Sequence, residues 1–211
     1  MAENYVNGEI DPDVKDVLYE IGNVGVGTAI IPIGNLRQME FFINTPNVFS
    51  MDQDIFHKID YDPEQVVVGV ITRMNDAFEG GIIFLLSKEF VRNTVHIMTE
   101  ESYSDEELMT NEDSVSAIHE MINYMTAGYA KVIGSYLNAP VFISTASIGM
   151  DKAKNIVQSV LEHAGKGAGQ IACVNTKFTV VDNKGKKTDE TGQALIIPDQ
   201  KSIEEFLKIM G

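Results

Sequence analysis

The two halves of this chain contain short segments of similar sequence in the same order. Residues 16–23 (DVLYEIGN) match residues 116–123 (SAIHEMIN), and residues 82–98 (IIFLLSKEFVRNTVHIM) match residues 194–210 (ALIIPDQKSIEEFLKIM). The second pair of matching segments is separated by more residues than the first pair. This difference predicts an insertion in the second half, at about Asp151–Gly169. The chain is therefore expected to contain two copies of one structural unit.

Each unit has the predicted order long helix, short strand, strand hairpin, helix. One such unit alone would leave a sheet edge and an apolar face open, so the two copies are expected to join their sheets. We predict a single domain over residues 1–211, with internal repeats at about 10–100 and 105–211. The 44% of hydrophobic residues supplies a core for a domain of this size.

Two long amphipathic helices are predicted, at about 12–36 and 112–138. At the start of the first, Asp11 is expected to cap the helix and Pro12 to take its first position. Apolar residues then recur three and four positions apart, as on one face of a helix. They are Val14, Val17, Leu18, Ile21 and Val24, and all five are expected on the buried side.

Runs of β-branched residues bounded by turn residues predict strands between the helices. Strands are expected at 39–44, 66–74, 82–86, 141–144, 170–181 and 193–197, and shorter helices at 53–59, 88–99, after Ser104, at 151–163 and at 201–210. The predicted fold class is α/β (α+β). Two αβ repeats related by a pseudo-twofold axis form a continuous, antiparallel-rich sheet flanked by helices, and the two long helices carry the candidate sites.

The charge of the chain excludes several classes of partner. The net charge is −15 at pH 7, without a basic patch, so nucleic-acid binding is not expected. No apolar run approaches the roughly 20 residues that span a bilayer, so membrane insertion is not expected either. The polar N-terminus lacks the features of a signal peptide, and the single cysteine, Cys173, suits a reducing compartment. These features predict a cytoplasmic location.

A carboxylate and an amide three positions apart occur at equivalent places on both long helices. The residues are Asp16, Glu20 and Asn23 on the first helix, and Ser116, Glu120 and Asn123 on the second. At 3.6 residues per turn each set falls on one face, opposite the apolar stripe, so the sets are expected to face solvent. One such pair would be an ordinary polar feature of a solvated helix, but its repetition favours a function.

Three glycines, Gly22, Gly25 and Gly27, interrupt the first long helix. Each costs roughly 0.8–1 kcal/mol relative to alanine inside a helix, so a compensating interaction is expected. Close packing of the two repeat helices is one explanation. Close approach of a partner surface to the Glu/Asn face is the other.

The motif resembles the signature of the CheC-type chemotaxis phosphatase family, within the CheC/CheX/FliY superfamily. That signature has Asp or Ser, then Glu, Asn and a later proline, and Pro46 stands at its spacing after Asn23. In the second copy the proline position is Ala146, and Pro140 comes earlier, which departs from the pattern. The resemblance covers about residues 10–210.

This resemblance implies an enzyme, a phosphatase that hydrolyses the aspartyl phosphate of CheY-like response regulators in two-component chemotaxis signalling. Asn23 and Asn123 would orient the attacking water, and Glu20 and Glu120 would dock on the regulator's active-site lysine. Asp16, Ser116 and Pro46 would support the sites. No cofactor or metal of the chain's own is expected, because its histidines lack ligand spacing. Mg²⁺ is expected on the phosphorylated regulator.

Two other functions fit the same sequence. The first is a non-catalytic or weakly catalytic adaptor that binds the receptor deamidase CheD, which the departure at Ala146 favours. The second is a relative of the flagellar switch proteins. Those proteins carry an additional switch domain, and the sequence up to Gly211 supplies none.

Overall fold

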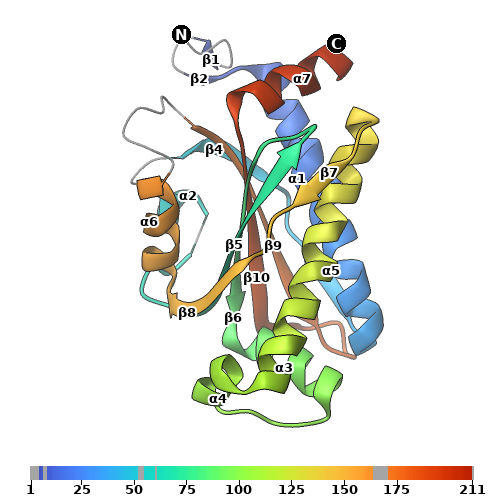
Figure 1. Cartoon of the computed structure of the whole chain (residues 1–211), viewed down its shortest axis with the longest axis vertical. Helices are drawn as coiled ribbons and strands as arrows, with labels where there is room; N and C mark the ends of the chain where they lie inside the picture. The colour runs from blue at the N-terminus through green and yellow to red at the C-terminus, as the bar shows by residue number, and fades with distance from the viewer. Residues whose placement is uncertain (1–4, 7–8, 52–54, 60, 164–170, 211) are drawn as a thin grey trace.

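The computed structural model describes residues 5–6, 9–51, 55–59, 61–163 and 171–210 (Figure 1). The first half contains β1 (Tyr5–Val6), β2 (Glu9–Ile10), α1 (Pro12–Arg37), β3 (Glu40–Ile43), β4 (Asn47–Met51), α2 (Ile55–Lys58), β5 (Val66–Asp76), β6 (Gly80–Ser87) and α3 (Lys88–Thr99). The second half contains α4 (Asp105–Thr110), α5 (Glu112–Leu137), β7 (Val141–Ile143), β8 (Ser147–Lys152), α6 (Ala153–His163), β9 (Ile171–Val181), β10 (Lys187–Pro198) and α7 (Gln200–Met210).

One antiparallel sheet joins the two halves, in the order β3-β9-β10-β6-β5-β7. Strand β4 also pairs with β9, and β8 also pairs with β5. The two halves therefore exchange their short strands. Strands β3 and β4 of the first half pair with the β9–β10 hairpin, and β7 and β8 of the second half pair with the β5–β6 hairpin. The predicted antiparallel-rich sheet flanked by helices is confirmed, and neither half contains all the strands that complete its own hairpin.

Helices cover both faces of this sheet (Figure 1). Along β6, Ile82, Phe84 and Leu86 belong to the core beneath α1 and α5. The alternate residues Ile83 and Leu85 belong to a second core beneath α2 and α6. This alternation follows from the two-residue period of a strand.

Helices α1 and α5 cross at small residues. A β-carbon placed on Gly128 of α5 would lie 2.6 Å from the Ala29 Cα of α1, and one placed on Gly25 would overlap the Tyr129 ring. Because Glu20 of α1 meets Tyr136 of α5 while Ala29 meets Gly128, the two helices run antiparallel. Packing between the repeat helices accounts for Gly25. Near the β-carbon position of Gly27, the described residues place one neighbour, Ile43 at 3.9 Å.

The crossing predicts opposite effects for two glycine-to-alanine changes. Gly128→Ala is expected to lower the free energy of unfolding by about 2 kcal/mol, because the new methyl group meets backbone and forces the helices apart. Gly27→Ala is the matched control and is expected to raise the free energy of unfolding by up to about 1 kcal/mol, through helix propensity alone. Urea denaturation measures both. Equal stability of the two variants would contradict this packing.

Several local predictions were wrong or incomplete. Strands β1, β2, β4 and β8 were not predicted. Val24, placed on the buried side, is 36% exposed. The predicted insertion at Asp151–Gly169 lies partly outside the described residues. The second hairpin also contains additional residues between β9 and β10 compared with the first hairpin. The pairing of β9 with β10 is irregular between Lys187 and Thr191.

Helix α1 is long and apolar enough to span a membrane by composition, with a mean hydropathy of 1.3. In the structure 56% of that apolar window is buried, against α5, the sheet and α7. The helix therefore behaves as a core helix of the fold.

Candidate functional site

Helix α1 presents the first motif from its N-terminal half. The Asp11 side chain accepts a hydrogen bond from the Asp13 backbone N–H at 2.9 Å, and Pro12 is the first helical residue, as predicted. Asn23 is exposed, and within the described part of the chain its amide has no side-chain hydrogen-bond partner. A primary amide can accept one hydrogen bond from a water molecule and donate others, so Asn23 is free to bind water or a ligand.

Glu20 lies one turn before Asn23 and is only half-buried rather than fully exposed. The Tyr136 hydroxyl of α5 donates a hydrogen bond to the Glu20 Oε1 at 2.8 Å. Burial, and then the neighbouring Glu20 carboxylate, raise the pKa of the Tyr136 hydroxyl above its usual value. Tyr136 is therefore a neutral donor at physiological pH.

The backbone next to Asn23 is fixed to the sheet. Thr176 of β9 donates from its hydroxyl to the Gly22 carbonyl at 3.1 Å. A β-carbon on Gly22 would lie 2.6 Å from the Val174 side chain and 3.1 Å from the Cβ of the buried Pro46. Gly22 is thus explained by contact with the sheet, and Pro46 packs directly behind the first motif.

Helix α5 presents the second motif, and both Glu120 and Asn123 are exposed. Here the hydroxyl of Tyr124, on the same helix, donates to the Glu120 Oε1 at 2.7 Å. This hydrogen bond and the charge of Glu120 raise the pKa of Tyr124. Asn111 caps the helix, and its side chain accepts from the Asp113 and Ser114 backbone N–H groups.

The remaining predicted residues lie beside these motifs. Asp16 and Ser116 are exposed, one turn before the two glutamates. Ala146, at the position of the missing proline, is half-buried and packs against the main core. Strand β8 begins directly after Ala146, as β4 begins directly after Pro46, so the loss of the proline leaves the start of the strand in place.

The two motifs are separate sites. The antiparallel crossing places the first motif beside the C-terminal end of α5 and leaves the second motif at the opposite end of the helix pair. Among the described residues, no group of three or more His, Cys, Asp or Glu side chains could hold a metal ion. Cys173 is buried and burial raises its pKa, which suits an unreactive thiol.

The comparisons with known proteins agree on one fold. No protein-family model matches the chain. The chain is 20% identical to the CheY-P phosphatase CheC of Bacillus subtilis over 96% of both chains. It superposes on Thermotoga maritima FliY with a TM-score of 0.65 and 20% identity, covering 94% of this chain and 98% of that one. The chain has the CheC/CheX/FliY fold. The family resemblance seen in the sequence is confirmed.

A further structural neighbour is solved as a complex. The CheX–CheY–BeF₃–Mg²⁺ complex of Borrelia burgdorferi matches with a TM-score of 0.52 and 13% identity, covering 86% of this chain and 97% of that one. Its likeness to the present chain, like that of FliY, is a likeness of fold. The proteins that this chain is similar to thus include one named as a CheY-P phosphatase, one named FliY and one solved with CheY.

Sequence reasoning missed two tyrosines that donate hydrogen bonds to the motif glutamates. Tyr124 follows Glu120 by four positions, a spacing at which helical side chains meet, so a search for partners of Glu120 would have found it. Tyr136 lies 116 positions from Glu20 in the sequence. Only the register of α1 against α5 brings them together, and the sequence does not show that register.

Proposed function

We propose that this chain accelerates hydrolysis of the aspartyl phosphate of a CheY-like response regulator in chemotaxis signalling. The observation that carries the proposal is the pair of exposed amides, Asn23 and Asn123, each three residues after a glutamate on equivalent helices. The relative named as a CheY-P phosphatase and the neighbour bound to CheY support the same partner.

The chemistry asks mainly for positioning. An aspartyl phosphate is a mixed anhydride whose leaving group is a carboxylate, so little acid–base help is needed. The water oxygen bonds to phosphorus while the bond from phosphorus to the aspartate oxygen breaks. One proton of the water stays on its oxygen, and the other passes to a phosphate oxygen. Asn23 or Asn123 would hold that water in line by accepting one of its hydrogen bonds.

Docking is assigned to the glutamates. Glu20 and Glu120 would each accept hydrogen bonds from a cationic side chain of the regulator, and charge-assisted pairs of this kind are short and strong. The net charge of −15 favours contact with a locally basic face. A chain that acts on this partner is expected in the cytoplasm. Binding to CheD stays a prediction.

Mg²⁺ is assigned to the regulator, as the sequence resemblance implies. The expected result is that the chain accelerates decay of an acetyl-phosphate-loaded regulator when Mg²⁺ is present, and that EDTA abolishes the acceleration. Calorimetry of the chain alone with Mg²⁺ is expected to show no binding. A decay rate that is the same with and without the chain would reject the proposed function.

A further inference from the structure

The carboxylate of Glu20 is held from outside its own helix. Tyr136 of α5 donates to it at 2.8 Å, and the Tyr136 ring lies against Phe206 of α7 with ring centroids 6.1 Å apart. Phe206 in turn packs edge-to-face on Phe78, at 5.7 Å, in the connection between β5 and β6. A row of aromatic rings therefore leads from that connection, through α7, to the first motif.

Among the described residues, no side chain from another helix bonds to Glu120 of the second motif in this way. In the sequence repeat, Leu36 stands where Tyr136 stands, and Thr94 stands where Phe206 stands. Leu36 has no phenol hydroxyl to donate a hydrogen bond, and Thr94 has no aromatic ring. Conversely, Val24 stands in α1 where Tyr124 stands in α5. Each glutamate is thus held by one tyrosine, but from different places.

We propose that Tyr136 is the positioning residue of the first site, holding the Glu20 carboxylate ready for a cationic side chain of the regulator. The inference rests on the proposed function and deepens it. The Tyr136 ring packs against Phe206, so α7 supports the residue that holds Glu20.

The geometry allows Glu20 to serve both partners. A carboxylate has two oxygens and about four lone-pair positions, and Tyr136 uses one of them on Oε1. Oε2 has no hydrogen-bond partner among the described residues and can accept from the regulator. Fixing the side chain in advance removes rotamer entropy that binding would otherwise have to overcome.

Burial separates the two tyrosines. Tyr136 is half-buried and contacts Glu20 of α1 and Phe206 of α7, whereas Tyr124 is 44% exposed and bonds within one helix. Water competes with the exposed pair, so Tyr124 is expected to order Glu120 much less than Tyr136 orders Glu20.

The experiment measures each site alone in the full-length chain. With the second site disabled by Asn123→Ala, Tyr136→Phe is expected to raise the KM for the phosphorylated regulator about fivefold and to leave kcat unchanged. The matched control is Tyr124→Phe in the Asn23→Ala background, where a change in KM below about twofold is expected. An unchanged KM for Tyr136→Phe would overturn the inference.

A second arm separates positioning from a general effect on the fold. When Glu20→Ala is added to the Asn123→Ala background, Tyr136→Phe is expected to have no further effect on KM. A further rise in KM there would show that Tyr136 does not act through Glu20, and would also overturn the inference. Failure of the unmodified chain to accelerate decay would instead reject the proposed function itself.

Discussion

Replacing both Asn23 and Asn123 with alanine is expected to reduce the acceleration of regulator dephosphorylation by about 100-fold or more. Both amides are exposed and lie at the same place in the two repeats, so each single variant retains one complete site. Removing both takes away the only groups that the account assigns to the attacking water. The decay rate of the phosphorylated regulator, at saturating concentrations of the variant, measures the loss.

The matched control removes two other exposed helix asparagines, Asn35 of α1 and Asn93 of α3. Asn35→Ala with Asn93→Ala changes the surface equally but is expected to leave the decay rate unchanged. Circular dichroism and urea denaturation show whether both double variants are folded. Full activity of a folded Asn23→Ala, Asn123→Ala variant would contradict the assignment.

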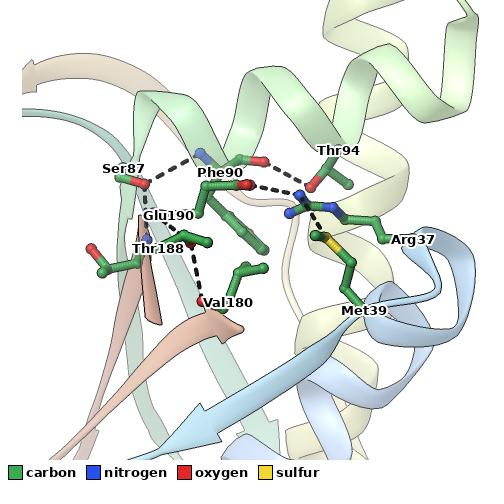
Figure 2. A network of polar contacts seen from close by, with 9 residues as sticks. Arg37, Met39, Ser87, Phe90, Thr94, Val180, Thr188 and Glu190 are labelled. Atoms are coloured by element: carbon green, nitrogen blue, oxygen red, sulfur yellow. Dashed lines mark hydrogen bonds and ion pairs between the residues drawn. The ribbon is translucent and has the colours of Figure 1, made fainter. Parts of the chain in front are cut away.

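The largest effect on stability is expected from a buried ion pair that joins the two halves of the chain (Figure 2). At the end of α1, the Arg37 Nη2 lies 2.7 Å from the Glu190 Oε2 of β10, and the two side chains are only 2% and 9% exposed. The Arg37 guanidinium also lies over the Phe90 ring, 5.6 Å from its centroid, and Nη2 contacts the Met39 sulfur at 3.3 Å. Its Nε and Nη1 atoms have no hydrogen-bond partner in the described part of the chain.

Glu190→Ala leaves the Arg37 charge buried without its counterion, so the free energy of unfolding is expected to fall by about 3 kcal/mol. Replacing both residues with methionine removes both charges and keeps most of the volume. That double variant is expected to stay within about 1 kcal/mol of the unmodified chain. Urea denaturation compares the three proteins. A Glu190→Ala variant of undiminished stability would show that the pair does not hold α1 on β10.

Sequence periodicity was sufficient for the long elements. Helix α1 was predicted at about 12–36 and spans Pro12–Arg37, and α3 was predicted at its observed bounds, Lys88–Thr99. Both have cap residues and a regular apolar stripe, which are local signals. Strands β4 and β8 were missed because they form by pairing with β9 and β5, which lie far away in the sequence.

The candidate site was predictable to the same extent. The four motif residues share one spacing in two matching segments, so the sequence alone singles them out. The half-buried state of Glu20 follows from Tyr136, and the fixed backbone behind Asn23 follows from Thr176. Both contacts come from the other half of the chain. They depend on how the halves interlock, which no local pattern encodes.

The exposed faces of α1 and α5 are expected to enter the phosphorylation pocket of a regulator. A crystal structure of this chain with a CheY-like regulator loaded with beryllofluoride and Mg²⁺ tests it most directly. The Asn23 or Asn123 amide is expected within about 3 Å of a water in line with the beryllium, and the preceding glutamate on a cationic side chain. A regulator docked on another surface, with both amides still facing solvent, would contradict it.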